Sequence, residues 1–367
     1  MRNLLVTGGA GFIGVNFVRR MVRNSNVRIT VIDALTYAGN GASLGGLPDD
    51  RLRFVHGDIR NTELVEGILR EDSCDTIVHF AAESHVDRSI EGPDAFISTN
   101  VDGTHSLLKA ARSAWLSGDG HDHRFHHVST DEVYGTLGPG DPPFSEDNQY
   151  QPNSPYSASK AGSDHLVRAY HHTFGLNVTT SNCSNNYGPY QFPEKLIPLM
   201  IVKILHGEPL PIYGDGMQIR DWLYVDDHCR AIEMCIDRGR PGEMYNIGGD
   251  NERPNIEIVK RLCSLVAAAF RESPDLAKRF PKCPVAEGED PMSLVTYVED
   301  RPGHDRRYAI DYTKAKRELG YEPEETFETG FRKTLDWYLG NGDWWSSVMD
   351  GSYRDWMSTN YASRADL

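Results

Sequence analysis

The sequence has no apolar run that approaches the ~18–20 residues of a membrane-spanning helix, so we expect no membrane partner. Its N-terminal apolar run, Leu4 to Val6, is too short for the core of a signal peptide. The six cysteines include no CxxC pair and are too sparse for a disulfide framework. Together these absences favour a cytoplasmic protein with reduced, buried thiols.

Positive charge is also scarce. The chain has 38 Lys and Arg residues against 53 Asp and Glu residues, which gives a formal net charge of −15 at pH 7. So acidic a surface repels a polyphosphate, and we therefore expect no nucleic-acid partner. A small anionic ligand is still compatible with this charge, because backbone dipoles and a few arginines can hold it locally.

Metal ligands at a recognisable spacing are missing as well. Histidines gather at His121, His123, His126 and His127, but no cysteine or further ligand accompanies them at the spacing of a metal site. We expect no bound metal, and we interpret the cluster as an exposed loop that leads into a strand. The pair at 171–172 is interpreted as the surface of a helix.

The chain does contain a regular alternation of apolar strands and helical patterns. Its 367 residues, 39% of them hydrophobic, are enough for two domains. Such an alternation indicates an α/β fold with a parallel sheet that is covered on both faces. The pattern predicts strands at 3–7, 28–33, 52–56, 76–80 and 125–129, and helices at 12–22, 61–69, 94–115 and 155–174.

Proline changes this pattern after about Ser181. Prolines at 189, 193, 198, 209 and 211 interrupt long regular elements, so we expect a smaller, loop-rich C-terminal domain. The expected boundary separates residues 1–184 from 185–367, with about 221–250 returning to the first domain. Residues 271–293 are polar and interrupted by proline, and we expect them to form a surface excursion.

A glycine-rich turn follows the first predicted strand. Gly8, Gly11 and Gly14 form a GxxGxxG pattern that leads directly into a helical pattern. Glycines at this spacing let the backbone approach a pyrophosphate, whose charge then faces the N-terminus of the helix. The second predicted strand ends at Asp33, a carboxylate that can accept both ribose hydroxyls of NAD and would repel the extra phosphate of NADP. These features predict a Rossmann-type, doubly wound domain that binds NAD, with Phe12 and Ile13 of the turn also at the cofactor.

A tyrosine and a lysine lie one helical turn apart near the start of the helix predicted from Pro155. Tyr156 and Lys160 have i, i+4 spacing and therefore share one face. The pKa of a phenol must fall by about 3, equivalent to about 4 kcal/mol, for it to act as a base near pH 7. An ammonium about 4 Å away supplies about this much at an effective dielectric of about 20. With the glycine pattern upstream, this half of the chain resembles the extended short-chain dehydrogenase/reductases, which implies a base at Tyr156 with Thr130 as its hydroxyl partner.

Two adjacent carboxyl groups, Asp131 and Glu132, follow the fifth predicted strand. Strand ends in an open α/β sheet face the ligand crevice, so we expect these groups beside the Tyr156–Lys160 pair. Two carboxyls provide a general acid and a general base, which a simple epimerase does not need. The pair therefore favours a reaction with an additional acid–base step.

Several longer segments of the sequence indicate a resemblance to a narrower family. The chain resembles the dTDP-glucose 4,6-dehydratases over nearly its whole length, except 271–293. This resemblance implies a lyase with NAD as cofactor and dTDP-glucose as substrate, and it implies a homodimer formed through the helices near 94–115 and 155–174. The segments are AAESHVDRSI (81–90), STDEVYG (129–135), SPYSASK (154–160), NCSNNYGPY (182–190) and RPGHDRRYAID (301–311).

The implied reaction has three steps. Tyr156 takes the proton of the sugar hydroxyl at carbon 4 while NAD takes the hydride, which gives a 4-keto sugar. The ketone acidifies carbon 5, where Glu132 removes the proton while Asp131 protonates the departing hydroxyl at carbon 6. The hydride then returns to carbon 6, which leaves a 4-keto-6-deoxy sugar and regenerates NAD.

Cationic side chains are needed to hold a diphosphate in so acidic a chain. Lys195, Arg220 and Arg301 are candidates because these groups pair with phosphate oxygens. The resemblance implies a larger set around the nucleotide sugar, namely Ser84, Thr130, Asn185, Lys195, Leu196, Pro211, Tyr213, Arg220, Asn255, Arg301, His304 and Tyr361. On the cofactor side it implies Thr36, Asp58, Ile59, Ala81, Ala82, Thr99, Tyr156, Lys160 and Asn186.

Three other functions are compatible with this scaffold. A UDP-sugar 4,6-dehydratase is one, because thymidine and uridine differ by a methyl group worth only about 1–3 kcal/mol in a pocket. A nucleotide-sugar decarboxylase or epimerase is another, although we expect those enzymes to lack the Asp131–Glu132 pair. A non-catalytic NAD sensor is the third, and it would be expected to lack Tyr156 or Lys160.

Overall fold

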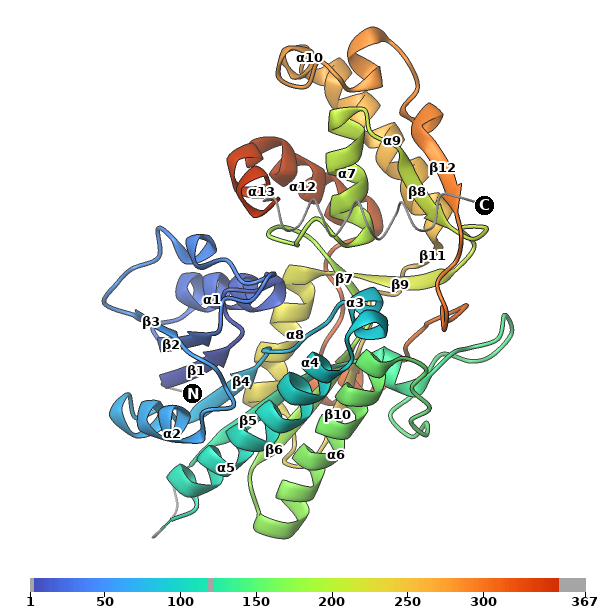
Figure 1. Ribbon diagram of the computed structural model, residues 1–367. Helices are drawn as coiled ribbons and strands as arrows, with labels where there is room; N and C mark the ends of the chain where they lie inside the picture. The colour runs from blue at the N-terminus through green and yellow to red at the C-terminus, as the bar shows by residue number, and fades with distance from the viewer. Residues whose placement is uncertain (1–2, 118–121, 350–367) are drawn as a thin grey trace.

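A parallel β-sheet of seven strands forms the centre of the N-terminal half (Figure 1). The computed structural model describes residues 3–117 and 122–349. Each strand pairs in parallel with its neighbours, and the sheet order reverses between β1 and β4, as in a doubly wound fold. The predicted α/β class is confirmed. The order across the sheet is β10 (Met244–Ile247), β6 (Val178–Cys183), β5 (Arg124–Thr130), β4 (Thr76–His79), β1 (Asn3–Thr7), β2 (Arg28–Asp33) and β3 (Leu52–His56).

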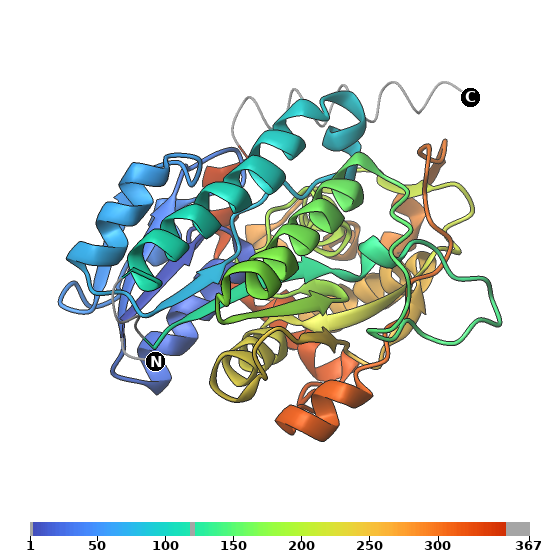
Figure 2. The ribbon, with the colours of Figure 1, turned by 90° about the horizontal axis from the view of Figure 1, so that it is seen from below.

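Helices cover both faces of this sheet (Figure 2). Each helix is amphipathic and turns its apolar face to the strands. The apolar side chains form one buried cluster on each face of the sheet. One face is covered by α1 (Phe12–Asn24) and α8 (Val225–Arg238), and the other by α2 (Thr62–Glu71), α5 (Thr104–Trp115) and α6 (Pro155–Phe174).

The helix expected at 94–115 is divided into three segments in the structure. A short α-helix, α4 (Asp94–Phe96), continues into a π-helical turn, η2 (Ile97–Gly103), before α5 begins. Asn100 of the π-helical turn donates to the carbonyl of Glu83 and to the hydroxyl of Ser159. Sequence periodicity does not predict such a turn, because a single wider turn changes the spacing only locally.

His126 and His127 lie in β5, where a strand was predicted, and they are buried, which corrects only the expectation that the histidine cluster is exposed. His126 contacts the hydroxyls of Thr179 and Ser181 on β6, at 2.9 and 3.1 Å. His127 donates to a carboxylate oxygen of Asp164 on α6 at 3.0 Å. These polar partners satisfy both ring nitrogens of His126 and Nε2 of His127 at the centre of the sheet, whereas Nδ1 of His127 has no hydrogen-bond partner within the described residues.

The other histidines of these clusters differ in their surroundings. The ring of His123 stacks on Trp115 with centroids 5.0 Å apart, and His121 lies outside the described residues. His171 is half-buried and contacts the carbonyl of Leu176, whereas His172 is exposed on α6.

The C-terminal half contains more regular structure than its prolines predict. Helices α7, α9 and α12 enclose one large apolar core with the strands beside them. Pro198 lies in the first turn of α7, where no helical N–H bond is lost. The elements are α7 (Leu196–His206), α9 (Asn255–Glu272), α10 (Asp275–Arg279), α11 (Thr313–Leu319), α12 (Phe327–Gly340) and α13 (Gly342–Val348), with strands β7 (Asn185–Tyr187), β8 (Leu210–Tyr213), β9 (Ile219–Tyr224), β11 (Glu252–Pro254) and β12 (Val295–Val298).

Most of residues 271–293 are exposed, as expected of a surface excursion, but three apolar side chains of the segment join this core. Leu276, Phe280 and Cys283 are buried against α9 and α12. The polar residues between them are exposed, and for that reason the composition of the segment hides its apolar positions. In the described parts of the chain, no helix is both long enough and apolar enough to cross a membrane.

We expect the buried histidines to lower the free energy of unfolding as the pH falls below about 6.5, the pKa of histidine in an unfolded chain. Burial lowers the pKa of His79, His126, His127 and His228, and that of His228 falls to about 3. The unfolded chain therefore binds protons in this range that the folded protein does not bind. Each buried histidine contributes stability that is complete above pH 6.5 and is lost at up to about 1.4 kcal/mol per pH unit below it.

Urea denaturation at about pH 7.5, 6.5 and 5.5 measures this dependence. His228→Gln removes one of the four groups, so its free energy of unfolding should change less steeply with pH than that of the wild type. His172→Gln, on the exposed surface of α6, is the matched control and should keep the wild-type slope. An unchanged slope in His228→Gln would contradict the titration argument.

Candidate active site

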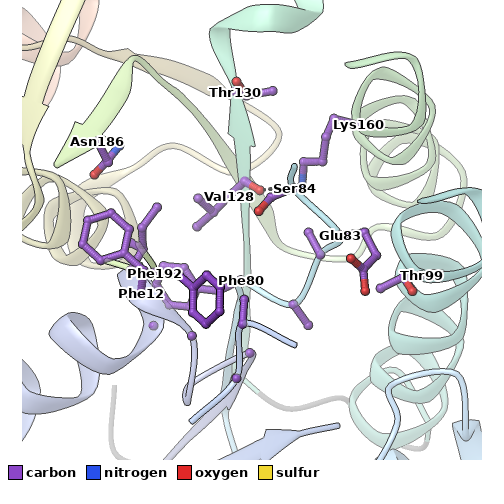
Figure 3. A pocket seen from close by; sticks show the side chains of 18 of the residues that line it. Phe12, Phe80, Glu83, Ser84, Thr99, Val128, Thr130, Lys160, Asn186 and Phe192 are labelled. Carbon is purple, nitrogen blue, oxygen red and sulfur yellow. Dashed lines mark hydrogen bonds between the residues drawn. The ribbon is translucent and has the colours of Figure 1, made fainter. Parts of the chain in front are cut away.

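One large cavity of about 410 Å³ lies at the carboxyl ends of the central strands (Figure 3). It brings together five of the twelve residues predicted around the sugar (Thr130 among them, which is also a predicted catalytic residue), all five predicted catalytic residues and all of the predicted cofactor residues. These are Ser84, Asn185, Lys195 and Leu196; Thr130, Asp131, Glu132, Tyr156 and Lys160; and Gly8, Gly11, Phe12, Ile13, Gly14, Asp33, Thr36, Asp58, Ile59, Ala81, Ala82, Thr99 and Asn186.

The glycine-rich turn has no room for side chains. A Cβ on Gly8 would lie 2.6 Å from the backbone nitrogen of Ala81, and one on Gly14 would lie 2.2 Å from the carbonyl oxygen of Gly8. Gly8 also has a φ of +68°, in the left-handed region that favours glycine. Helix α1 begins directly after this turn without a side-chain cap, so its N-terminal N–H groups are available to a pyrophosphate.

Asp33 lies at the end of β2 and is fixed by two backbone donors. The amides of Ala10 and Leu35 donate to its two carboxylate oxygens at 2.9 and 2.8 Å. Burial raises its pKa, and the hydrogen bonds from Leu35 and Ala10 oppose that rise. The glycine turn and this fixed carboxylate on one cavity wall fit the pyrophosphate and the ribose of NAD.

Helix α6 directs Tyr156 and Lys160 into the same cavity. The helix begins with a capping box at Ser154 and has Pro155 in its first turn, so its start is well defined. Lys160 points from α6 toward the strand with Val128 and Thr130 (Figure 3), and its Nζ donates to the Val128 carbonyl at 2.8 Å.

The surroundings of Tyr156 differ from the sequence-based expectation. Burial and then the charge of Glu132 raise the pKa of Tyr156, while a hydrogen bond with Thr130 opposes the rise. Burial outweighs the lowering that was expected from Lys160. A base at this position therefore requires a further positive charge close to the phenol.

Asp131 and Glu132 begin the short 3-10 helix η3 (Asp131–Tyr134), which follows β5 at once. The hydroxyl of Thr130 accepts from the Glu132 amide at 3.3 Å and so caps this turn. Asp131 is only 1% exposed, and its Oδ2 has no hydrogen-bond partner within the described ranges. Burial, followed by the charges of Glu132 and Asp221, raises the pKa of Asp131 well above its usual value, which favours the protonated form of its carboxyl.

The charges around Glu132 differ from those around Asp131. Burial raises its pKa, but three cations, Arg301, Arg220 and Lys195, oppose that rise. The two adjacent carboxyls therefore have different electrostatic surroundings. Such a difference is typical of a pair in which one carboxyl acts as an acid and the other as a base.

The three predicted cations are all held by the protein. Lys195 donates to the carbonyl of Ser84 at 2.9 Å. Arg220 stacks over Tyr308, with its guanidinium carbon 4.3 Å from the ring centroid. Arg301 pairs with Asp87 at 2.8 Å.

Six residues predicted for the nucleotide sugar do not line the cavity. Two of them still adjoin the site, because Arg220 and Arg301 act electrostatically on Glu132. Tyr213 donates to Asp87 at 2.9 Å, and its ring meets that of His304 edge to face. The six are Pro211, Tyr213, Arg220, Asn255, Arg301 and His304; Tyr361 lies outside the described residues.

The cavity also includes side chains that the sequence analysis did not single out. Phe80 and Phe192 line it together with the carboxyl groups of Glu83 and Glu194. Phe192 and Glu194 belong to the segment QFPEKL, which also contains the predicted residues Lys195 and Leu196. Their position beside these two residues could have indicated that they line the site. Over residues 3–117 and 122–349, no group of three or more His, Cys, Asp or Glu side chains could hold a metal ion.

Comparison with known proteins defines the class to which this site belongs. The model of the family described as GDP-mannose 4,6 dehydratase matches residues 5–334, and the chain belongs to that family. A dTDP-glucose 4,6-dehydratase from Xanthomonas campestris pv. campestris is 57% identical over 358 residues, which cover 96% of this chain and 98% of the relative.

Two crystal structures agree with this narrower similarity. DesIV, a dTDP-glucose 4,6-dehydratase from Streptomyces venezuelae with NAD bound, has a TM-score of 0.84 and 47% identity over 94% of this chain and 99% of its own. A dTDP-glucose 4,6-dehydratase from Bacillus anthracis in complex with NAD has a TM-score of 0.81 and 43% identity over 95% and 100% of the two chains. The predicted resemblance to the dTDP-glucose 4,6-dehydratases is confirmed.

Proposed function

We propose that the protein is a hydro-lyase that converts dTDP-glucose to dTDP-4-keto-6-deoxyglucose and water, with NAD as its cofactor. The observation that decides for this function is the unequal carboxyl pair, Asp131 and Glu132, in one cavity with Tyr156, Lys160 and the glycine turn. An oxidoreductase or an epimerase requires the tyrosine and the turn but not a buried acid beside a second carboxylate.

The residues of the oxidation step surround the phenol of Tyr156. When bound, NAD supplies the hydride acceptor for carbon 4, the hydride donor for carbon 6 and a positive charge near this phenol. We infer that Tyr156 takes the proton of the sugar hydroxyl at carbon 4. Thr130 orients the phenol by a hydrogen bond, and Lys160 is held in place by the carbonyl of Val128.

The elimination step is assigned to the two carboxyl groups after β5. Glu132 takes the proton from carbon 5, because its three nearby cations keep part of its population ionised despite burial. Asp131 protonates the hydroxyl that leaves carbon 6, because burial and then the charge of Glu132 raise the pKa of its carboxyl and favour the protonated form. Water is the leaving group. As carbon 6 is reduced, Glu132 returns its proton to carbon 5, and the proton that Tyr156 took from the hydroxyl at carbon 4 restores the acid form of Asp131, so atoms and electrons balance.

The reaction can be followed with dTDP-glucose that has deuterium at carbon 4. We expect the deuterium in the new methyl group at carbon 6, because the hydride returns to the same sugar. Mass spectrometry and NMR of the product measure its position. Loss of the label to solvent, or its release as free reduced cofactor, would reject the closed redox cycle. A parallel incubation with UDP-glucose tests the rival nucleotide, and we expect slower turnover than with dTDP-glucose.

Glu132→Gln separates oxidation from elimination. We expect the variant to reduce its bound NAD in the presence of dTDP-glucose but to form the 4-keto-6-deoxy product at least about 100-fold more slowly. Absorbance of reduced nicotinamide measures the first step, and product mass measures the whole reaction. Glu63→Gln, on the exposed side of α2, is the control. Wild-type product formation by Glu132→Gln would reject Glu132 as the base.

We also propose that the chain has two domains. Residues 1–184 bind NAD, and residues 185–367 mainly bind the nucleotide sugar. Residues of about 221–250 return to the first domain. The support for this return is that α8 packs beside α1 and that β10 pairs with β6 at the edge of the large sheet.

We infer that the protein acts in the cytoplasm and has no nucleic-acid partner. All six cysteines are buried and unbridged, which is typical of a reducing compartment. The net charge of −15 disfavours a polyanionic partner.

A homodimer is the expected assembly, formed through α5, α6 and the turns before α5. These helices lie side by side on the outer face of the sheet (Figure 2). Ile97, before α5, and Phe174, at the end of α6, are 47% and 38% exposed, which is unusual for side chains of this size.

Ile97→Glu should weaken this dimer about 30-fold or more, because it places a charge in an apolar contact. Light scattering over a range of protein concentrations measures the dissociation. Tyr297→Glu is the control, since Tyr297 is another large exposed side chain, 59% exposed, on β12 of the other half. A wild-type protein that is monomeric at all concentrations would reject the proposal.

A further inference from the structure

Three segments that are distant in sequence meet at the side of the cavity. Tyr37 lies in the loop after β2, Arg88 in the short helix α3 (Val86–Glu91), and Glu194 just before α7. The hydroxyl of Tyr37 donates to Oε1 of Glu194 at 3.0 Å. The guanidinium of Arg88 lies 3.9 Å from the centroid of the Tyr37 ring, and its Nε is 3.4 Å from Oε2 of Glu194.

Glu194 is buried in this cluster, with only 1% of its side chain exposed. Burial raises its pKa, while Lys195, Arg88 and the hydrogen bond from Tyr37 oppose the rise. A buried carboxylate without partners is costly, so separation of these groups requires either new partners or water. The edge of Phe192 also packs on the ring of Tyr37, with centroids 5.8 Å apart.

The cluster connects two walls of the cavity. Thr36, Ala38 and Gly39, on both sides of Tyr37 in the sequence, line one wall. Phe192, Glu194 and Lys195 line the other, and Figure 3 shows Phe192 on the same side as Phe12 of the glycine-rich turn. The hydrogen bond between Tyr37 and Glu194 therefore joins two segments that line the cavity, 36–39 and 192–195.

We propose that Tyr37, Arg88 and Glu194 form a clasp that retains NAD in the cavity between turnovers. The clasp rests on the proposed function, in which the cofactor is regenerated in each cycle and has no need to leave. Tyr37 and Glu194 are positioning residues for the cofactor, because they connect the walls around it and take no part in proton transfer. Opening of the cavity for NAD exchange requires their hydrogen bond to break.

Tyr37→Phe tests the clasp without a change of charge. Holoprotein loaded with radiolabelled NAD is mixed with an excess of unlabelled NAD, and the label that stays bound is measured over time. We expect the variant to release NAD about 10-fold faster than the wild type, as the loss of a hydrogen bond to a charged group predicts. The thermal midpoint of the holoprotein should stay within a few degrees of the wild type.

Tyr297→Phe removes a hydroxyl from an exposed tyrosine on β12 and should leave the release rate unchanged. A wild-type release rate in Tyr37→Phe would overturn the clasp. A release rate that rises only in proportion to a lowered thermal midpoint would also overturn it, because general destabilisation then explains the effect.

A double-mutant cycle with Glu194→Gln tests whether the two residues act through each other. In a clasp, the double variant releases NAD no faster than the faster single variant. Additive effects of the two substitutions on the logarithm of the rate would overturn the proposal. Arg88→Lys, which keeps the charge but loses the planar contact with Tyr37, replaces Glu194→Gln in the cycle if that variant does not fold, and the same criterion applies.

The NAD-release experiments test the clasp separately from the experiments that test the proposed reaction. If the wild type binds NAD but does not convert dTDP-glucose, the proposed function fails and the release rates still decide the clasp. If the wild type binds no NAD, both proposals fail.

Discussion

The pairing of β5 between β4 and β6 is the constraint on which the site depends. Parallel pairing places the ends of these strands at one edge of the sheet, so Thr130, Asp131 and Glu132 emerge where the glycine turn after β1 also lies. The carbonyl of Val128, two residues before the end of β5, accepts from Nζ of Lys160. The same strand therefore positions both the carboxyl pair and the lysine of the neighbouring helix.

A buried polar network holds α6 against this strand. The carboxylate of Asp164 accepts from His127, Ser129 and Tyr150 at 3.0, 2.9 and 2.9 Å. Burial raises the pKa of Asp164 to about 6, and Lys160 and the hydrogen bonds from Ser129 and Tyr150 oppose the rise. Because Asp164 lies one turn after Lys160 on α6, the network sets the rotation and height of the helix relative to β5.

The features near the N-terminus were predictable because they are local. The strands at 3–7, 28–33 and 52–56 have their predicted bounds, and Gly8, Gly14 and Asp33 line the cavity together. Strand β6 was not predicted, because its sequence, VTTSNC, has a polar pattern although every residue in it is buried. Its threonine and serine hydroxyls are satisfied by His126, whose position in the chain is more than fifty residues away.

The same reasoning explains the other differences between sequence and structure. Leu276, Phe280 and Cys283 are too widely spaced among exposed residues for their burial to be read from composition. The contact of Tyr37 with Glu194 joins two segments that only the fold brings together, and no local pattern predicts it. Local sequence thus predicts the backbone of the site, whereas the polar partners of buried side chains depend on long-range pairing.

The difference between Asp131 and Glu132 is the last consequence of this arrangement. The two residues are adjacent in sequence and begin the same turn, so their separate roles cannot come from the backbone. Asp131 is next to two other carboxylates, Glu132 and Asp221, and has Arg220 as its opposing cation, whereas Glu132 has three. The cations that a diphosphate requires therefore also favour the ionised form of Glu132 over that of Asp131. In this way an acidic protein can hold an anionic substrate and separate a proton donor from a proton acceptor with one set of basic side chains.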